Sequence, residues 1–128
     1  MATEAVHEGE DRVYNGLRDD AGNCHVWVVA TGAVVGHPLP PRLDLANKSP
    51  SGFEWAYAGS SPAQLALALC ADALGDEAAL RVFQRFKFRV VGRLPCDEPW
   101  TLTAAEVRRH CHELGAERAG IDAGPDDP

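Results

Sequence analysis

The segment SSPAQLALALCADALGD, residues 60–76, decides the fold because it combines a helix start with an almost unbroken apolar run. Ser61 suits an N-cap, and Pro62 suits the first helical position, where no backbone donor is required. Gln64 follows the cap by three residues, so Ser61 and Gln64 together predict a capping box. The sequence therefore predicts a helix that begins at Pro62.

This predicted helix has almost no polar face. Between residues 63 and 74 only Gln64 and Asp72 are polar, and Gly75 is well placed to end the helix. Surface helices normally keep a wide polar face, and a helix of this length, about 18 Å, is too short to span a bilayer. We expect it at the centre of the domain. The alternative is that residues 62–74 form an interface between copies of the chain.

A second helix is predicted over residues 77–91, with Asp76 as its N-cap. Apolar residues line one side of it, and arginines recur every four residues along another side. The alternation in FKFRV, residues 86–90, is also typical of a strand, so the end of this segment stays open between helix and strand.

A third helix is predicted near the C-terminus. Thr103 and Glu106 have the spacing of a capping box, in which each side chain bonds the backbone amide of the other residue. The helix is expected over residues 104–114, with Gly115 as its end.

The N-terminal part predicts a β-hairpin. Residues 12–17 suit a first strand, the turn formers DDAGN occupy residues 19–23, and the β-branched and aromatic segment CHVWVVA occupies residues 24–30. Residues 33–35 suit a third strand. Prolines then argue against long regular structure in residues 37–52, which we expect to form an ordered loop.

These elements predict an α+β fold, in which a small antiparallel β-sheet of two to four strands packs against two or three α-helices. One domain is expected over residues 12–115. Residues 1–11 and 116–128 are small and polar, and we expect them to be flexible acidic tails. The net charge of −7 lies mainly near the two ends, because residues 1–20 hold six acidic and two basic residues, and residues 112–128 hold five acidic and one.

Length and composition indicate a single soluble domain, since 45% of the 128 residues are hydrophobic. No stretch approaches the roughly 20 apolar residues of a membrane span, and the N-terminus lacks a secretory signal, so the sequence predicts a cytoplasmic protein with no membrane partner. The four widely spaced cysteines are expected to be free thiols. His110 and His112 point nearly opposite ways on a helix, so no metal site is predicted.

The basic segment 81–93 is the most distinctive surface feature, because it holds no acidic residue and its cations are interleaved with phenylalanines. This combination suits single-stranded nucleic acid or an acidic protein groove. The alternative is a solvated helix face whose arginines pair with nearby acids. The candidate binding residues are Arg81, Arg85, Lys87, Arg89 and Arg93.

A second candidate site precedes the apolar helix. Amides at a helix N-terminus attract anions, and a serine-containing turn stands at that position. Two aromatic residues precede the turn, and they either line a ligand groove or cover the central helix. The candidate residues are Glu54, Trp55, Tyr57, Gly59, Ser60 and Ser61.

A nucleophilic triad at this turn would use Ser60 or Ser61 as the nucleophile. No spacing selects its partners, no GxSxG signature is present, and a serine that caps a helix is a poor nucleophile. The residues available as base or third member are Lys48, His25, His110, Asp44 and Glu54.

Four segments carry a family resemblance: SPSGFEWAYAGSSPAQLALALCADALGD (49–76), FQRFK (83–87), RLP (93–95) and WTLTAAEV (100–107). Together they resemble a family of small bacterial, archaeal and phage proteins classified only as a domain of unknown function, over about residues 12–109.

Relatives in this family tend to have glycine at the positions of Ala56, Ala58 and Ser61, and histidine at the position of Lys48. The chain is therefore not expected to need extreme glycine flexibility in the turn or a catalytic histidine at position 48. The family has no established activity, so the resemblance implies kinship without a mechanism.

Two functions stay open from the sequence. The first is a noncatalytic binding or regulatory module that uses the basic segment on a protein or nucleic-acid partner. The family's spread into phages adds, by analogy, a host-directed inhibitor. The alternative is a small enzyme that acts on an anionic phosphate or ester substrate near Glu54–Ser61. No cofactor is expected in either case.

Overall fold

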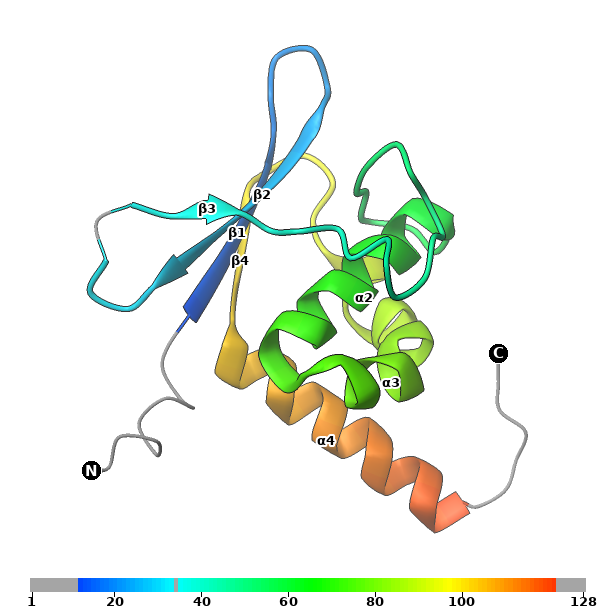
Figure 1. Ribbon diagram of the computed structural model, residues 1–128. Coiled ribbons are helices and arrows are strands. Elements are labelled where there is room, and N and C mark those ends of the chain that lie inside the picture. The colour runs from blue at the N-terminus through cyan, green and yellow to red at the C-terminus, as the bar shows by residue number, and fades with distance from the viewer. Residues whose placement is uncertain (1–11, 34, 122–128) are drawn as a thin grey trace.

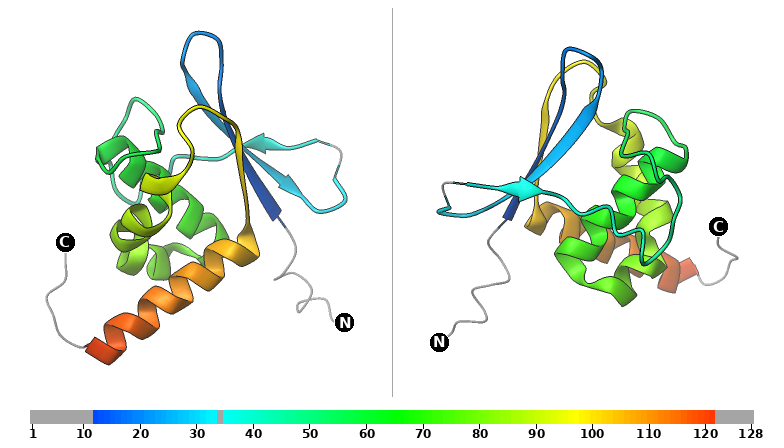
Figure 2. Two further views of the ribbon diagram at one scale, coloured as in Figure 1. Left: turned by 180° about the vertical axis from the view of Figure 1, so that it is seen from behind. Right: turned by 45° about the horizontal axis from the view of Figure 1, so that its top comes forward.

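The structure is a computed structural model that describes residues 12–33 and 35–121. The described chain forms one antiparallel sheet with strand order β3-β2-β1-β4, and its helices pack on one face of that sheet (Figure 1, Figure 2). The predicted α+β class is confirmed. The elements are β1 (Arg12–Arg18), β2 (Cys24–Ala30), β3 (His37–Pro38), α2 (Ser60–Leu74), α3 (Asp76–Arg89), the 3-10 turn η1 (Val91–Arg93), β4 (Trp100–Thr103) and α4 (Ala104–Ile121).

The predicted hairpin is confirmed, with β1 paired to β2 from Arg12 opposite Ala30 to Arg18 opposite Cys24. Asp19 organises the turn, because its side chain accepts bonds from the backbone amides of Ala21 and Asn23 and from His25 Nε2, each at 2.9 Å. The bond from His25, together with these amides, lowers the pKa of Asp19 to about 2.

The two faces of the sheet differ in burial, as the alternation of side chains along a strand requires. Tyr14, Val26 and Val28 point toward the helices and are almost fully buried, whereas Leu17 and Trp27 face solvent. The sheet therefore forms one layer of a two-layer structure, with one face packed against the helices and the other exposed to solvent.

The third and fourth strands differ from the prediction. Residues 33 and 35 lie in loop structure and residue 34 lies outside the described residues, whereas the two-residue β3 follows at His37–Pro38. The sequence analysis missed β4, which is only four residues long. It pairs with β1 where Gly16 faces Trp100, and a Cβ at Gly16 would overlap the Trp100 indole.

Helix α2 lies at the centre of the domain, as predicted. Its residues from Pro62 to Ala71 are all buried. The side chains pack against the sheet, α3 and α4 of the same chain, and the Tyr14 hydroxyl donates a 2.6 Å hydrogen bond to the Asp72 carboxylate. Burial, then this hydrogen bond, raises the pKa of Tyr14. The structure gives no support to the alternative of an oligomer interface through residues 62–74, because residues 62–71 are already covered within one chain.

The capping box predicted at the start of α2 is wrong. The N-cap is Gly59, with no side-chain cap bond, and the Ser61 hydroxyl bonds Ser49 Oγ at 2.8 Å. Gln64 is fully buried. Its side-chain oxygen accepts bonds from the amides of Lys48 and Ser49, and its Nε2 donates to the carbonyls of Pro41 and Ala46.

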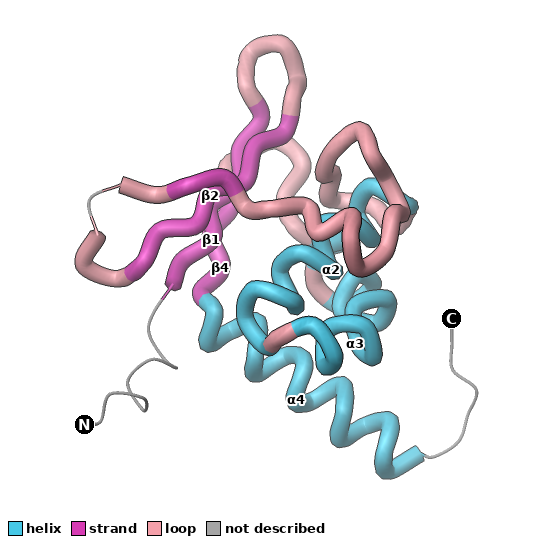
Figure 3. The backbone as a smooth tube through the Cα atoms, in the orientation of Figure 1, coloured by secondary structure: helices cyan, strands magenta, loops and turns pink. Residues whose placement is uncertain are grey.

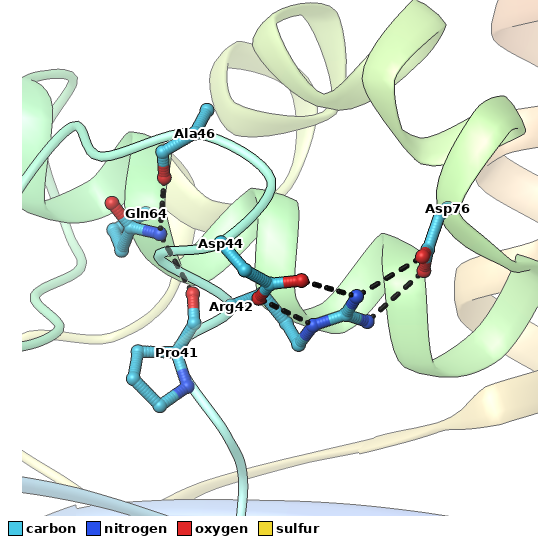
Figure 4. Close-up of polar contacts among 6 residues, drawn as sticks. All are labelled: Pro41, Arg42, Asp44, Ala46, Gln64 and Asp76. Carbon is cyan, nitrogen blue, oxygen red and sulfur yellow. Dashed lines mark hydrogen bonds and ion pairs between the residues drawn. The ribbon is translucent and has the colours of Figure 1, made fainter.

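Gln64 thereby fixes the long loop between β3 and α2, which crosses from the sheet to the helices (Figure 3). Arg42 holds the same loop to α3, because its guanidinium bonds both oxygens of Asp44 and both oxygens of Asp76 at 3.0 Å (Figure 4). Asp76 was predicted to cap α3, but the N-cap is Gly75 and no side-chain cap bond forms. The Asp76 carboxylate is used by Arg42 instead.

The open question over residues 86–90 is settled in favour of helix. Helix α3 continues to Arg89, and Val90 leads into η1. The second predicted capping box is confirmed at the start of α4, where Glu106 Oε1 accepts from Thr103 N at 2.9 Å and Thr103 Oγ1 accepts from Glu106 N at 3.0 Å.

The predicted end of the last helix is wrong, because α4 continues through Gly115 to Ile121. A glycine inside a helix costs only about 1 kcal/mol relative to alanine, so a glycine alone does not end one. The predicted tails lie outside the described residues at 1–11 and 122–128, and residues 116–121 belong to α4.

Candidate functional site

Helix α3 has one buried side and one exposed side. At 100° per residue, Ala79, Val82, Phe83 and Phe86 fall together and pack into the core. The opposite side carries Leu80, Arg81, Gln84 and Phe88, and the buried Lys87 lies at its border; we call these five residues the α3 surface. Its most exposed apolar side chains are Phe88 at 59% and Leu80 at 45%.

The arginines of the predicted basic stripe are divided among different partners. Arg81 forms an exposed 3.6 Å pair with Glu77 one turn earlier. Arg85 donates a 2.7 Å hydrogen bond to the carbonyl of Leu114, and Arg89 pairs with Glu113, so both reach across to α4. The residues predicted as one binding stripe therefore include two that tie α3 to α4.

The remaining two cations lie elsewhere. Lys87 is buried, with 9% of its surface exposed, and its ammonium lies 4.3 Å from the centroid of the exposed Phe88 ring. Arg93 is exposed in η1. The α3 surface thus combines the Phe88 ring with the Lys87 ammonium beside it and with Arg81 about two turns earlier on the helix.

Residues of the second candidate site that contact other side chains take structural roles. Trp55 is 1% exposed and packs edge-on against Trp100, with ring centroids 5.3 Å apart, so it covers the core. Glu54 forms a 2.9 Å ion pair with Arg18. The same guanidinium lies 4.9 Å from the centroid of the Trp55 ring and donates to Cys24 Sγ at 2.9 Å.

These surroundings disfavour the thiolate form of Cys24. Burial, followed by the negative charge of Glu54, raises the pKa of Cys24 to about 11. Cys70 and Cys111 are buried between α2 and α4 with their sulfurs 3.5 Å apart, and burial raises the pKa of Cys70 well above its usual value. The predicted free thiols are confirmed for all four cysteines.

The turn before α2 has a structural role for most of its members. Tyr57 is half exposed, and its ring lies against Gly59, where a Cβ would come within 2.8 Å of Cε2. The Ser61 hydroxyl is hydrogen-bonded to the Ser49 hydroxyl, and Ser60 is exposed. Ala56 has a φ of 78°, in the left-handed region that favours glycine. The expectation that this turn needs no glycine conformation is therefore wrong at Ala56.

No triad is assembled in the described part of the chain. Three of the acids and bases considered for it have other partners: His25 bonds Asp19, Asp44 bonds Arg42, and Glu54 bonds Arg18. His110 packs edge-on to Phe86, with centroids 6.3 Å apart. Within residues 12–33 and 35–121 there is also no cluster of three or more metal-ligating side chains.

A pocket that the sequence analysis did not identify lies beside β2. It has a volume of about 210 Å³ and is lined by Cys24, His25, Val26, Trp27, Pro38, Pro41, Gly52 and Phe53. The period-2 pattern correctly placed His25 and Trp27 on one face of the strand, but it does not say that this face meets solvent. No sequence signal predicts that Gly52 and Phe53 fold back beside the strand.

The fold defines a small α+β domain. The chain belongs to the Family of unknown function (DUF6166), whose model matches residues 14–113. This confirms the predicted membership of a domain family without an assigned function. No curated protein and no solved structure matches the chain. Among the described helices, none combines the length and hydropathy needed to cross a membrane.

Proposed function

We propose that this protein is a noncatalytic binding module that uses the α3 surface to engage an acidic segment of a partner protein. The observation that carries the proposal is the exposed Phe88 ring with the Lys87 ammonium 4.3 Å away and Arg81 on the same side of the helix. An aromatic anchor beside cations is a common arrangement at protein interfaces, where aromatic and arginine side chains contribute most of the binding energy.

The magnitudes favour Phe88 as the anchor. Full burial of a phenylalanine side chain contributes about 1.5–3 kcal/mol, and 59% of Phe88 is available for burial. The exposed Arg81–Glu77 pair is held by no more than about 1 kcal/mol, so a carboxylate of a partner replaces Glu77 easily.

Charge favours an acidic protein partner over nucleic acid. Nucleic-acid affinity increases with the number of phosphates that cations neutralise. Arg85 and Arg89 already bond Leu114 and Glu113, and Glu113 places a carboxylate at the margin of the surface. The small number of remaining cations suits a short acidic segment better than a phosphate backbone.

The enzyme alternative has no specific observation in its favour, because Glu54 and Ser61 have structural partners in different places. It stays a prediction from the sequence, as does the role of a host-directed inhibitor.

The test is selection of a random peptide library, displayed on phage, on the wild-type protein with counter-selection on Arg81→Glu/Phe88→Ser. We expect peptides that combine acidic and apolar residues. They should bind at least about tenfold more weakly to the double variant, and their affinity for the wild-type protein should fall as the salt concentration rises. Trp27→Ser is the matched control, because it removes an exposed aromatic side chain outside the α3 surface.

Peptides that bind the double variant and the wild type equally would contradict the proposal. If single-stranded oligothymidine binds the wild-type protein and this binding is lost in the double variant, the partner of the α3 surface is nucleic acid and not an acidic protein segment. Circular dichroism and chemical unfolding establish that the double variant retains its fold, which we expect because both side chains are exposed.

A further inference from the structure

The outer edge of β2 has backbone groups that no other strand pairs. The Asn23 carbonyl accepts from Asp19 N, on the side of β1, whereas the Val26 carbonyl accepts from Leu39 N on the opposite side, both at 2.9 Å. Because backbone groups alternate in direction along an antiparallel strand, Cys24 also directs its N–H and C=O away from β1.

This edge is only partly covered by β3. Strand β3 pairs with Trp27 and Val28, Leu39 extends this pairing to Val26, and beyond Leu39 the chain leaves the sheet for the helices (Figure 3). Among the described residues, the Cys24 N–H and the Cys24 C=O therefore have no backbone partner. They form a short unpaired edge of the kind that accepts an added strand.

The 210 Å³ pocket runs along this same edge, because four consecutive β2 residues, Cys24–Trp27, form one of its walls. Pro38, Pro41 and Phe53 also line it, and neither proline has an N–H that would compete for the edge. The volume lies below the roughly 300–1,000 Å³ of small-molecule sites. It suits one apolar side chain instead of a whole cofactor.

The charges around the pocket restrict what binds there. Its lining contains no lysine or arginine. Asp19 and Asp20 are exposed in the turn that leads into β2, and Glu54, which follows Phe53, holds the nearby Arg18 in an ion pair. A peptide segment with basic residues complements the negative charge around the pocket.

We propose that the β2 edge is a second binding site, which takes an extended, basic peptide segment of a partner protein as an additional strand. The peptide backbone bonds the N–H and C=O of Cys24, one apolar side chain enters the pocket beside Trp27 and Phe53, and a flanking lysine or arginine faces Asp19 and Asp20. Main-chain bonds then provide affinity and the pocket provides specificity. The site shares no residue with the α3 surface, so a test of one site does not decide the function proposed for the other.

The test uses a random peptide library displayed on phage, selected on the wild-type protein with counter-selection on Trp27→Ser. We expect peptides with an apolar residue flanked by lysine or arginine, and about tenfold weaker binding to Trp27→Ser. Val29→Ser is the matched control, since it changes the same strand and face outside the pocket, and it should leave binding unchanged. Arg81→Glu/Phe88→Ser should also leave binding of these peptides unchanged.

A second readout needs no variant. On addition of a selected peptide to the wild-type protein, amide hydrogen exchange should slow at Cys24, while Thr101 on the other edge strand stays unchanged. Unchanged exchange at Cys24 would overturn the proposal, as would equal binding to wild type and Trp27→Ser. A library that yields only acidic peptides dependent on Phe88 would overturn this site and support the α3 surface.

Discussion

Helices α2 and α3 meet at Gly75, yet they have opposite relations to solvent. Helix α2 is buried on nearly all sides, and even its glutamine is fully enclosed. Helix α3 buries one side and exposes Leu80, Arg81 and Phe88 on the other. The difference separates two roles, because a surrounded helix contributes stability and only a half-exposed one offers side chains to a partner.

The largest expected effect is on the apolar contacts of α2. Leu67→Ala removes a fully buried side chain and leaves a cavity, so we expect a loss of about 3–5 kcal/mol in the free energy of unfolding. Leu80→Ala is the matched change on α3 and should cost less than about 0.5 kcal/mol, since Leu80 is exposed. Urea unfolding measures both, and similar losses would break the comparison.

A loss of about 3 kcal/mol is expected for Gln64→Leu. The substitution keeps an apolar stem but leaves the amides of Lys48 and Ser49 and the carbonyls of Pro41 and Ala46 without their partner. Gln84→Leu on α3 serves as control and should be nearly neutral. If Gln64→Leu is also neutral, Gln64 does not organise the long loop.

A substitution at Ala56, in the turn that leads into α2, is expected to raise the free energy of unfolding, in contrast to the losses expected within α2. Because Ala56 has a φ of 78°, Ala56→Gly relieves backbone strain and should stabilise the protein by about 0.5–1 kcal/mol. Ala58→Gly, two residues later and without a positive φ, should destabilise it slightly through the entropy of the unfolded chain. Thermal unfolding distinguishes the two, and a destabilised Ala56→Gly would contradict the observed conformation.

The smallest expected effect is a pH dependence where α3 meets α4. Burial, followed by the charges of Arg109 and Arg89, lowers the pKa of His110 in the folded protein. The unfolded state then binds the proton more readily, so stability falls as pH drops below the ordinary histidine pKa of about 6.5. His110→Asn should flatten the unfolding free energy between about pH 5 and 7. If the unfolding free energy of His110→Asn depends on pH as steeply as that of the wild-type protein, His110 is not the cause of this dependence.

Local rules predicted what depends on neighbouring residues. The alternation of residues 24–30 identified β2, and the spacing of Thr103 and Glu106 identified a capping box that the structure confirms. The apolar run identified the central helix, because no arrangement other than burial or a partner satisfies it.

The errors arose where a side chain chooses among partners distant in sequence. Gln64 has the spacing of a capping residue, but the loop at residues 41–49 offers it four backbone groups. Asp76 suits an N-cap, but Arg42 lies within reach and bonds it bidentately.

The candidate binding residues show the same limit. Helical spacing placed Arg81, Arg85 and Arg89 on one side of α3, as the structure has them. Spacing alone did not show that α4 would engage Arg85 and Arg89. The exposed Phe88 and the pocket at β2 emerge only from packing, since the sequence does not reveal which apolar side chains lack a neighbour.

Amide hydrogen exchange along α2 and α3 in the unliganded protein, measured at several protein concentrations, tests the central claim most directly. We expect the amides of Leu65–Ala71 to exchange only through global unfolding, with a free energy equal to that from urea, whereas amides on the exposed side of α3 open more easily. Protection should not depend on concentration. Exchange in α2 as fast as in α3, or protection of α2 that rises with concentration, would contradict a scaffold helix enclosed within one chain.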